Sequence, residues 1–145
     1  MVKLLRIDRR LIHGQIAFAW TAYLDVNCIL VANDDAAGDD IRMATLRLAK
    51  PQNTKLIIKS IDDSIAAFKS GKTDACRLAK EIDDIKVVNL GNVKAHDDSK
   101  PYKGNRSINL TNDDQVKLNE LLDMGKTVEI RMVPNDGIKY FKMDI

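Results

Sequence analysis

The sequence predicts an α/β fold, with a mostly parallel central β-sheet and helices on both faces, in a single domain. Short apolar runs such as Cys28–Ala32 (CILVA) are typical of strands that are covered on both faces. Between these runs, apolar residues recur every three or four positions, which indicates amphipathic helices. Regular alternation of the two patterns predicts parallel βαβ units, and 145 residues fit one domain.

Each element follows from one of these patterns. Strands are expected at 2–7, 28–32, 55–59, 86–90, 107–110 and 127–132. Helices are expected at 12–23, 41–48, 61–68, 76–82 and 111–122, and polar loops at 33–38 and 91–106. Ser60 with Asp63, and Thr111 with Asp114, have the spacing of helix capping boxes. Gly125 stands where a glycine commonly ends a helix.

Composition excludes several classes of function. The 23 basic and 21 acidic residues nearly balance, at a net charge of +2, which argues against a general nucleic-acid binder. No apolar stretch approaches the ~18 residues of a membrane span, and no signal peptide is expected. Cys28 and Cys76 stand alone, so neither a disulfide framework nor a zinc site is expected. We therefore expect a cytoplasmic protein that reaches the membrane only through partners.

The stretch 6–15 (RIDRRLIHGQ) carries the chemistry. It joins the first strand to the first helix, which places His13 and Gly14 at a strand-to-helix turn. Helix N-termini offer free amide N–H groups and a positive dipole end to anions. Arginines add planar donors suited to phosphate. The sequence therefore predicts a phosphate site with His13 at its centre.

The neighbours of His13 have candidate roles. Arg10 is expected to neutralise charge on the phosphoryl oxygens, whereas Arg6 either contacts phosphate or lies on a solvated face. The backbone amides of Gly14 and Gln15 are expected to contact phosphate, unless Gly14 serves only the turn.

For other polar residues, the sequence gives weaker support for a role in the phosphate site. Asp8 is expected to orient Arg10 or the turn. Asn33 and Asp34 either border the pocket or form an exposed turn. Arg9 and His96 are expected at the surface, and Trp20 in the core.

Arg6 to Trp20 (RIDRRLIHGQIAFAW) closely resembles the phosphorylation-site motif of IIB components in the mannose/fructose/sorbose family of the bacterial sugar phosphotransferase system (PTS). The likeness continues through CILVANDDAAGDD, LRLAKPQNTKLIIKSIDDSIAAF, KVVNLGN and VEIRMVP, and so covers nearly the whole chain. Arg6, Asp8 and Arg10 fit the motif, whereas Arg9 departs from it, because many relatives carry an acidic residue or histidine there.

The resemblance implies a phosphocarrier. His13 would accept a phosphoryl group from a IIA component and pass it to a sugar during uptake through the IIC and IID membrane subunits. The sugar would belong to the mannose, fructose, sorbose or N-acetylgalactosamine class. No cofactor and no metal is expected.

Two other functions stay open. One is a histidine-dependent phosphatase in which His96 and Asp97 donate the proton. Such enzymes place an arginine directly before the nucleophile, where this chain has Ile12. The other is a non-catalytic, regulatory module that binds phosphate.

The alternation of strands and helices breaks near Asp74 and Ala75, where two helical patterns follow each other without a strand. The resemblance implies a strand here, next to the first strand of the sheet. A strand with two short loops needs about a dozen residues. Either these residues are missing from the sequence, or the deletion is real and 86–90 moves into the vacant place. We favour the first, because losing a central strand removes much of the core of a marginally stable domain.

Overall fold

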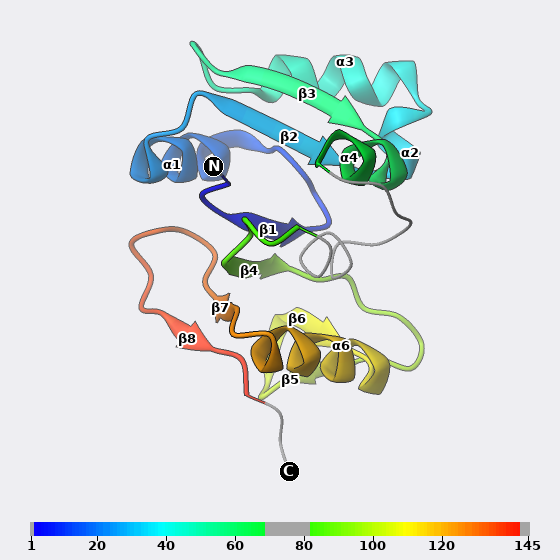
Figure 1. Cartoon of the computed structure of the whole chain (residues 1–145), viewed down its shortest axis with the longest axis vertical. Helices are drawn as coiled ribbons and strands as arrows, with labels where there is room; N and C mark the ends of the chain where they lie inside the picture. The colour runs from blue at the N-terminus through cyan, green and yellow to red at the C-terminus, as the bar shows by residue number, and fades with distance from the viewer. Residues whose placement is uncertain (1, 69–81, 143–145) are drawn as a thin grey trace. The chain divides into compact units, whose positions relative to one another are not determined.

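The computed structural model describes residues 2–68 and 82–142 (Figure 1). Their contacts divide the chain into two compact units. The first unit comprises Met1–Arg9 and Asp83–Ile145, and the second comprises Arg10–Ile82. Strands and helices alternate in the chain, and most strand pairings are parallel, so the predicted α/β class is confirmed.

The first unit is built on a four-stranded sheet in the order β1-β4-β7-β8. Its strands are β1 (Leu5–Asp8), β4 (Val87–Asn92), β7 (Thr127–Ile130) and β8 (Lys139–Tyr140). The first three run parallel, and β8 pairs antiparallel with β7. Because β4 is buried along Val88 to Gly91, it forms the centre of this unit.

A hairpin and a helix complete the first unit. Strands β5 (Lys100–Tyr102) and β6 (Asn105–Leu110) pair antiparallel across a turn at Lys103 and Gly104, both with positive φ. Such two-residue turns match the twist of paired strands. Helix α6 (Asn112–Asp123) follows, and its buried residues Leu118 and Leu121 join the core.

Helix α6 begins and ends as the sequence predicts. Thr111 and Asp114 form a complete capping box. At the other end, the N–H of Lys126 donates to the carbonyl of Leu121 and that of Gly125 to Leu122, with Gly125 at φ 78°. This is the Schellman arrangement, in which the left-handed position favours glycine.

Lys126 is a buried cation at the start of β7. Its Nζ donates to the carbonyl of Ile85 at 2.6 Å. Burial lowers the pKa of the Lys126 ammonium, and the charge of Lys86 lowers it further, while Asp83 acts in the opposite direction. The contact ties the segment before β4 to the segment before β7.

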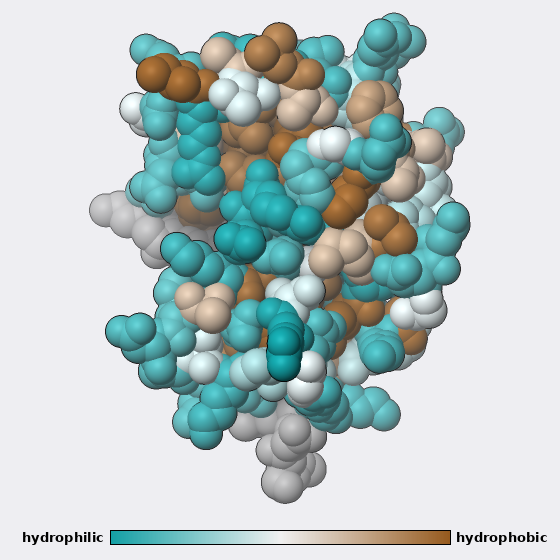
Figure 2. Space-filling model, turned by 180° about the vertical axis from the view of Figure 1, so that it is seen from behind, coloured by the Kyte–Doolittle hydropathy of each residue, from teal (hydrophilic) through white to brown (hydrophobic). Residues whose placement is uncertain are grey.

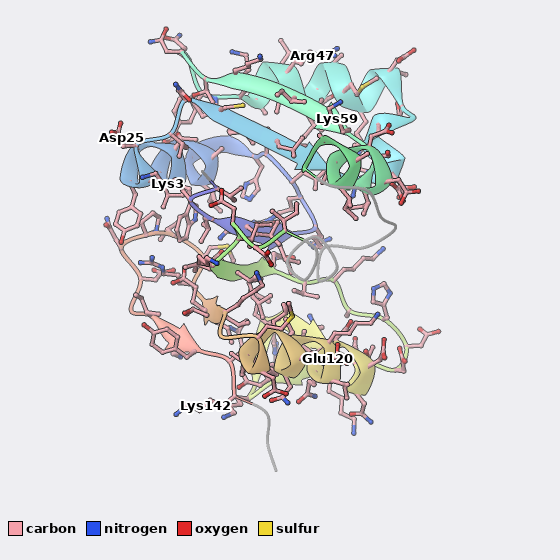
Figure 3. All side chains as sticks on the ribbon, viewed as in Figure 1. Lys3, Asp25, Arg47, Lys59, Glu120 and Lys142 are labelled. Atoms are coloured by element: carbon pink, nitrogen blue, oxygen red, sulfur yellow. The ribbon has the colours of Figure 1, made fainter. Side chains whose placement is uncertain are left out.

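The second unit contains a two-stranded parallel sheet and four described helices. Its elements are α1 (Gly14–Leu24), β2 (Cys28–Ala32), α2 (Asp34–Ala37), α3 (Asp40–Ala49), β3 (Lys55–Lys59) and α4 (Ile61–Phe68). β2 and β3 pair in register from Cys28 with Lys55 to Ala32 with Lys59. Its core contains Ile12, Val31, Ala36 and Leu46. Asp25, labelled in Figure 3, ends α1 in the left-handed conformation.

Most expected elements are present, with three corrections. The loop predicted at 33–38 contains helix α2, which is only four residues long. The loop predicted at 91–106 contains β5 and the start of β6. Strand β8 was not predicted. All three elements are short, so hydrophobic periodicity has too few residues to reveal them. The helix predicted at 76–82 lies outside the described residues, apart from Ile82.

The break at Asp74 and Ala75 also lies outside the described residues. Within the part of the chain that the structure describes, β1 pairs with β4 and β2 pairs with β3. Both explanations of the break stay predictions, because β4 pairs directly with β1 and the residues around the break lie outside the described ranges.

Helix α3 buries a different face from the one predicted by the helical spacing of Ile41, Ala44, Thr45 and Leu48. Ile41 and Leu48 are 81% and 89% exposed, whereas Leu46 is only 5% exposed. Figure 2 shows hydrophobic residues at the surface at the top of the view, where α3 lies. The sequence carries apolar residues on both sides of this helix, so spacing alone does not decide which side is buried.

This correction can be tested on two leucines of α3. We expect Leu46→Ala to lower the free energy of unfolding by about 2–5 kcal/mol, because it removes buried side-chain volume. The matched variant Leu48→Ala should change it by less than about 0.5 kcal/mol. Urea denaturation of both variants measures the difference. A larger loss in Leu48→Ala than in Leu46→Ala would restore the predicted face.

Candidate functional site

His13 stands at the start of α1, as the sequence predicts. It is the N-cap residue, with an extended backbone (φ −150°, ψ 134°), and its carbonyl accepts from the N–H of Ala17 at 3.4 Å. Its side chain makes no capping hydrogen bond, and the first turn of α1 contains no acidic residue. The N-terminal end of α1 therefore keeps the character of an anion-binding helix end.

The backbone around His13 turns sharply twice. Leu11 has φ 60° and Gly14 has φ 39°. A Cβ atom on Gly14 would meet no heavy atom within 4 Å. Glycine is therefore required at position 14 by conformation rather than by space, and the absent side chain leaves the first amides of α1 uncovered.

Four of the predicted site residues lie within six positions of one another in the second unit. Arg10 and His13 are half-buried, and Gly14 and Gln15 are exposed. This grouping combines a cation, an imidazole and helix-end amides in a single chain segment. Their predicted contacts with phosphate stay predictions.

Arg6 and Asp8 belong to the first unit, where they form an ion pair. The Arg6 Nη2 lies 2.9 Å from the Asp8 Oδ2, and the two side chains are 15% and 2% exposed. The Arg6 guanidinium also donates to the Asn89 Oδ1 and, at 3.3 Å, to the carbonyl of Arg131. Asp8 was expected to orient Arg10 or the turn, and the contact found here is with Arg6.

The ion pair continues into a second one through Asn89. The Nδ2 of Asn89 donates to the Glu129 Oε1 at 2.9 Å, and the Arg131 Nε lies 3.1 Å from the same oxygen. Asn89 is fully buried and Glu129 is 5% exposed. Two cations and two anions thus balance within this buried group.

Arg9 directly follows β1 and is hydrogen-bonded to Asn92 of β4. Its backbone N–H donates to the carbonyl of Asn92 at 2.9 Å, and its Nε donates to the Asn92 Oδ1 at 2.8 Å. Arg9 is exposed, as predicted. Its two bonds to one residue fix the point at which the chain departs toward His13.

Asn33 and Asp34 have helix-capping contacts. The Asn33 side chain accepts from the N–H of Ala36 and caps α2. The Asp34 Oδ1 accepts from the N–H of Ile61 at 2.9 Å, at the start of α4. Of the two readings from the sequence, these contacts fit a structured turn, and Asp34 is exposed. Whether either residue borders a pocket stays a prediction.

His96 lies apart from these groups in the sequence and is exposed, as predicted. Its backbone forms a turn with Ser99, whose hydroxyl accepts from the His96 N–H at 2.7 Å. Trp20 is buried, also as predicted, with its ring edge-on to Tyr23.

Residues 2–68 and 82–142 contain no cluster of three or more His, Cys, Asp or Glu side chains that could hold a metal ion. None of their helices has the length and hydropathy that a membrane crossing requires.

Sequence reasoning missed Asn89, Glu129 and Arg131. Asn89 and Glu129 interrupt the apolar runs VVNLGN and TVEI. A polar residue inside a strand that is otherwise buried signals a buried partner, because unpaired polar groups are costly there.

Comparisons with known proteins identify the family. The family model described as the PTS system sorbose subfamily IIB component matches residues 2–144. A Streptococcus pyogenes protein, described as a probable phosphotransferase enzyme IIB component, is 40% identical over 114 aligned positions, which cover 70% of each chain. The mannose-specific EIIAB component of Escherichia coli is 27% identical over 149 positions, which cover 94% of this chain and 46% of that longer protein.

Both alignments contain more positions than there are residues of this chain within them. At 94% coverage of 145 residues, about a dozen of the 149 positions have no residue of this chain opposite them. At 70% coverage, the alignment of 114 positions leaves about the same number. Each relative thus carries about a dozen extra residues within the aligned region.

The fold agrees with a solved structure of the same kind. The IIBSor domain of the sorbose permease of Klebsiella pneumoniae superposes with a TM-score of 0.83 at 25% identity, covering 95% of this chain and 91% of that one. With a family model that spans residues 2–144 and a structural neighbour of matching fold, the chain belongs to the family of sorbose-type IIB components of the sugar phosphotransferase system.

Proposed function

We propose that this protein is a phosphocarrier in which His13 accepts a phosphoryl group from a IIA component and transfers it to a sugar. Components of this family are phosphotransferases. The observation that carries the proposal is His13 at the N-cap of α1, where the first turn has no acidic residue and Arg10 precedes it by three positions. This arrangement suits a nucleophile that must carry a dianionic group.

The transfer has two steps. A neutral imidazole nitrogen of His13 attacks the phosphorus on the IIA phosphohistidine, and the donor's N–P bond breaks as the new one forms. A sugar hydroxyl then attacks the phosphorus, and the N–P bond to His13 breaks as the O–P ester bond forms. The hydroxyl proton passes to the leaving imidazole, so that His13 is released neutral. Arg10 neutralises the phosphoryl oxygens, and the amides of Gly14 and Gln15 hold them. No cofactor takes part.

The partners follow from this reaction. A IIA component is the donor, a proposal supported by the EIIAB relative, whose name joins the A and B components. The IIC and IID membrane subunits present the sugar, which belongs to the mannose, fructose, sorbose or N-acetylgalactosamine class. The protein then works in the cytoplasm, peripheral to the membrane through these subunits.

Labelling by a phosphorylated IIA component tests the proposal, since the chain contains only two histidines. We expect one phosphoryl adduct by intact mass spectrometry in the wild type and in His96→Ala, and none in His13→Ala. The adduct should be labile in acid and stable in alkali, as an N–P bond is. Circular dichroism checks that the variants fold.

Three results would contradict the assignment. An adduct on His13→Ala would place the phosphoryl group elsewhere. Rapid spontaneous loss of the label in the absence of sugar and membrane subunits would indicate a phosphatase. Binding of phosphate without any covalent adduct would indicate a regulatory module.

Substitutions of Arg10 test separately whether phosphoryl transfer needs the charge of this side chain or its planar geometry. Charge-assisted hydrogen bonds contribute about 1.5–3 kcal/mol. At about 1.4 kcal/mol per decade, Arg10→Lys should slow labelling of His13 by one to two decades, because lysine keeps the charge but loses the planar pair of donors. Arg10→Ala should be at least as slow. Wild-type rates in both variants would show that this side chain is only solvated.

We also propose that the protein forms a single IIB domain whose native chain contains a further strand between α4 and β4. The dozen extra positions of the relatives support this, as does the single strand partner that β1 and β2 each have among the described residues. The protein from its native source should then exceed 16.3 kDa by more than about 1 kDa, the mass of about a dozen residues. A native mass of 16.3 kDa would show that the deletion is real.

A further inference from the structure

Three polar residues of the first unit lie in one row across its sheet. Arg6 of β1 is the register partner of Asn89 of β4, and Asn89 is the register partner of Glu129 of β7. Neighbouring strands in register place such side chains side by side on one face. Three adjacent strands thus each contribute a polar side chain to one face of the sheet.

Gly91, two residues beyond Asn89 on β4, explains where the Arg6 side chain goes. A Cβ atom on Gly91 would lie 2.2 Å from the Cζ of Arg6. The guanidinium therefore occupies the space that a side chain at position 91 would fill, and from there it reaches the Asp8 carboxylate.

This contact acts on the last residue of β1. The register of β1 with β4 shifts between Ile7 and Asp8, so the strand is irregular where it ends. Asp8 is held there by Arg6, and Arg9 by its two bonds to Asn92. His13 follows Asp8 by five residues, which span at most about 18 Å when extended.

We propose that the Arg6–Asp8 ion pair, seated on Gly91, is a positioning device for the segment that carries His13. Arg6 and Asp8 then act on phosphoryl transfer through the start of this segment, without touching the phosphoryl group. The inference rests on the proposed function for its kinetic consequences, and it gives Arg6 a role different from the phosphate contact that the sequence suggests.

Two variants disturb the pair in different ways. Asp8→Asn removes one charge and keeps the size of the side chain. Gly91→Ala keeps every charge but forces the guanidinium from its place. Gly137→Ala is the matched control, because a Cβ there meets nothing within 4 Å and its φ is not in the left-handed region.

Phosphorylation of His13 is followed at increasing concentrations of phosphorylated IIA. We expect Asp8→Asn and Gly91→Ala each to lower the maximal rate by about tenfold to a hundredfold, since small displacements of a reacting group have effects of this size. The concentration of donor at half-maximal rate should change less than about twofold. The double variant should be no slower than the slower single variant, and Gly137→Ala should match the wild type.

A second readout does not depend on phosphorylation. The Cε1–H resonances of His13 and His96 are compared by NMR in the wild type and the variants, with His13→Ala giving the assignment. Asp8→Asn and Gly91→Ala should shift the His13 signal and leave that of His96 unchanged. If Asp8→Asn does not fold, the double variant Arg6→Gln with Asp8→Asn takes its place, because it leaves no unpaired charge in the pair.

The outcomes separate the two claims. Wild-type rates and an unshifted His13 signal in both variants would overturn the positioning role and leave the phosphocarrier standing. A shifted signal in a protein that never accepts phosphate would overturn the phosphocarrier and keep the positioning role. An increased rate in Asp8→Asn, with a loss in Arg6→Lys, would make Arg6 a phosphate ligand and overturn the proposal.

Discussion

The first unit depends on the mutual neutralisation of buried charges at the end of its parallel strands. Arg6, Asp8, Glu129 and Arg131 are each at most 15% exposed in their side chains, and each cation has an anion at about 3 Å. Removing one partner of such a pair typically costs about 3–5 kcal/mol, because the other charge stays buried without compensation. The group therefore constrains β1, β4 and β7 to one register.

Sequence patterns predicted the long elements well for a physical reason. Cys28–Ala32 and Lys55–Lys59 were predicted with their observed bounds, because apolar residues at the middle of each strand stand out against the polar turns on either side. Helix α2 and strand β8, of four and two residues, depend on contacts with distant parts of their unit, which local periodicity does not contain. For α3, the helix was predicted, but its buried face was decided by packing in the second unit.

The sequence likewise revealed some residues of the candidate site and not others. His13, Arg10, Gly14 and Gln15 are close in sequence, so a single motif reveals them together. The Arg6 guanidinium meets Asn89, 83 residues away, and its place against Gly91 has no signal near position 6. Asn89 and Glu129 could have been suspected as polar residues inside buried strands, but their partners come from the topology of the sheet.

The chain passes from the first unit to the second between Arg9 and Arg10. Arg9 is bound to Asn92 of the first unit, whereas Leu11 packs against the core of the second unit. A leucine at φ 60° costs about 1–2 kcal/mol in backbone strain, so its apolar contacts must offset that cost. Arg10 belongs to the second unit and directly precedes Leu11, whose position the core of that unit holds. A side chain that starts beside a fixed backbone position loses less entropy when it meets a phosphoryl group.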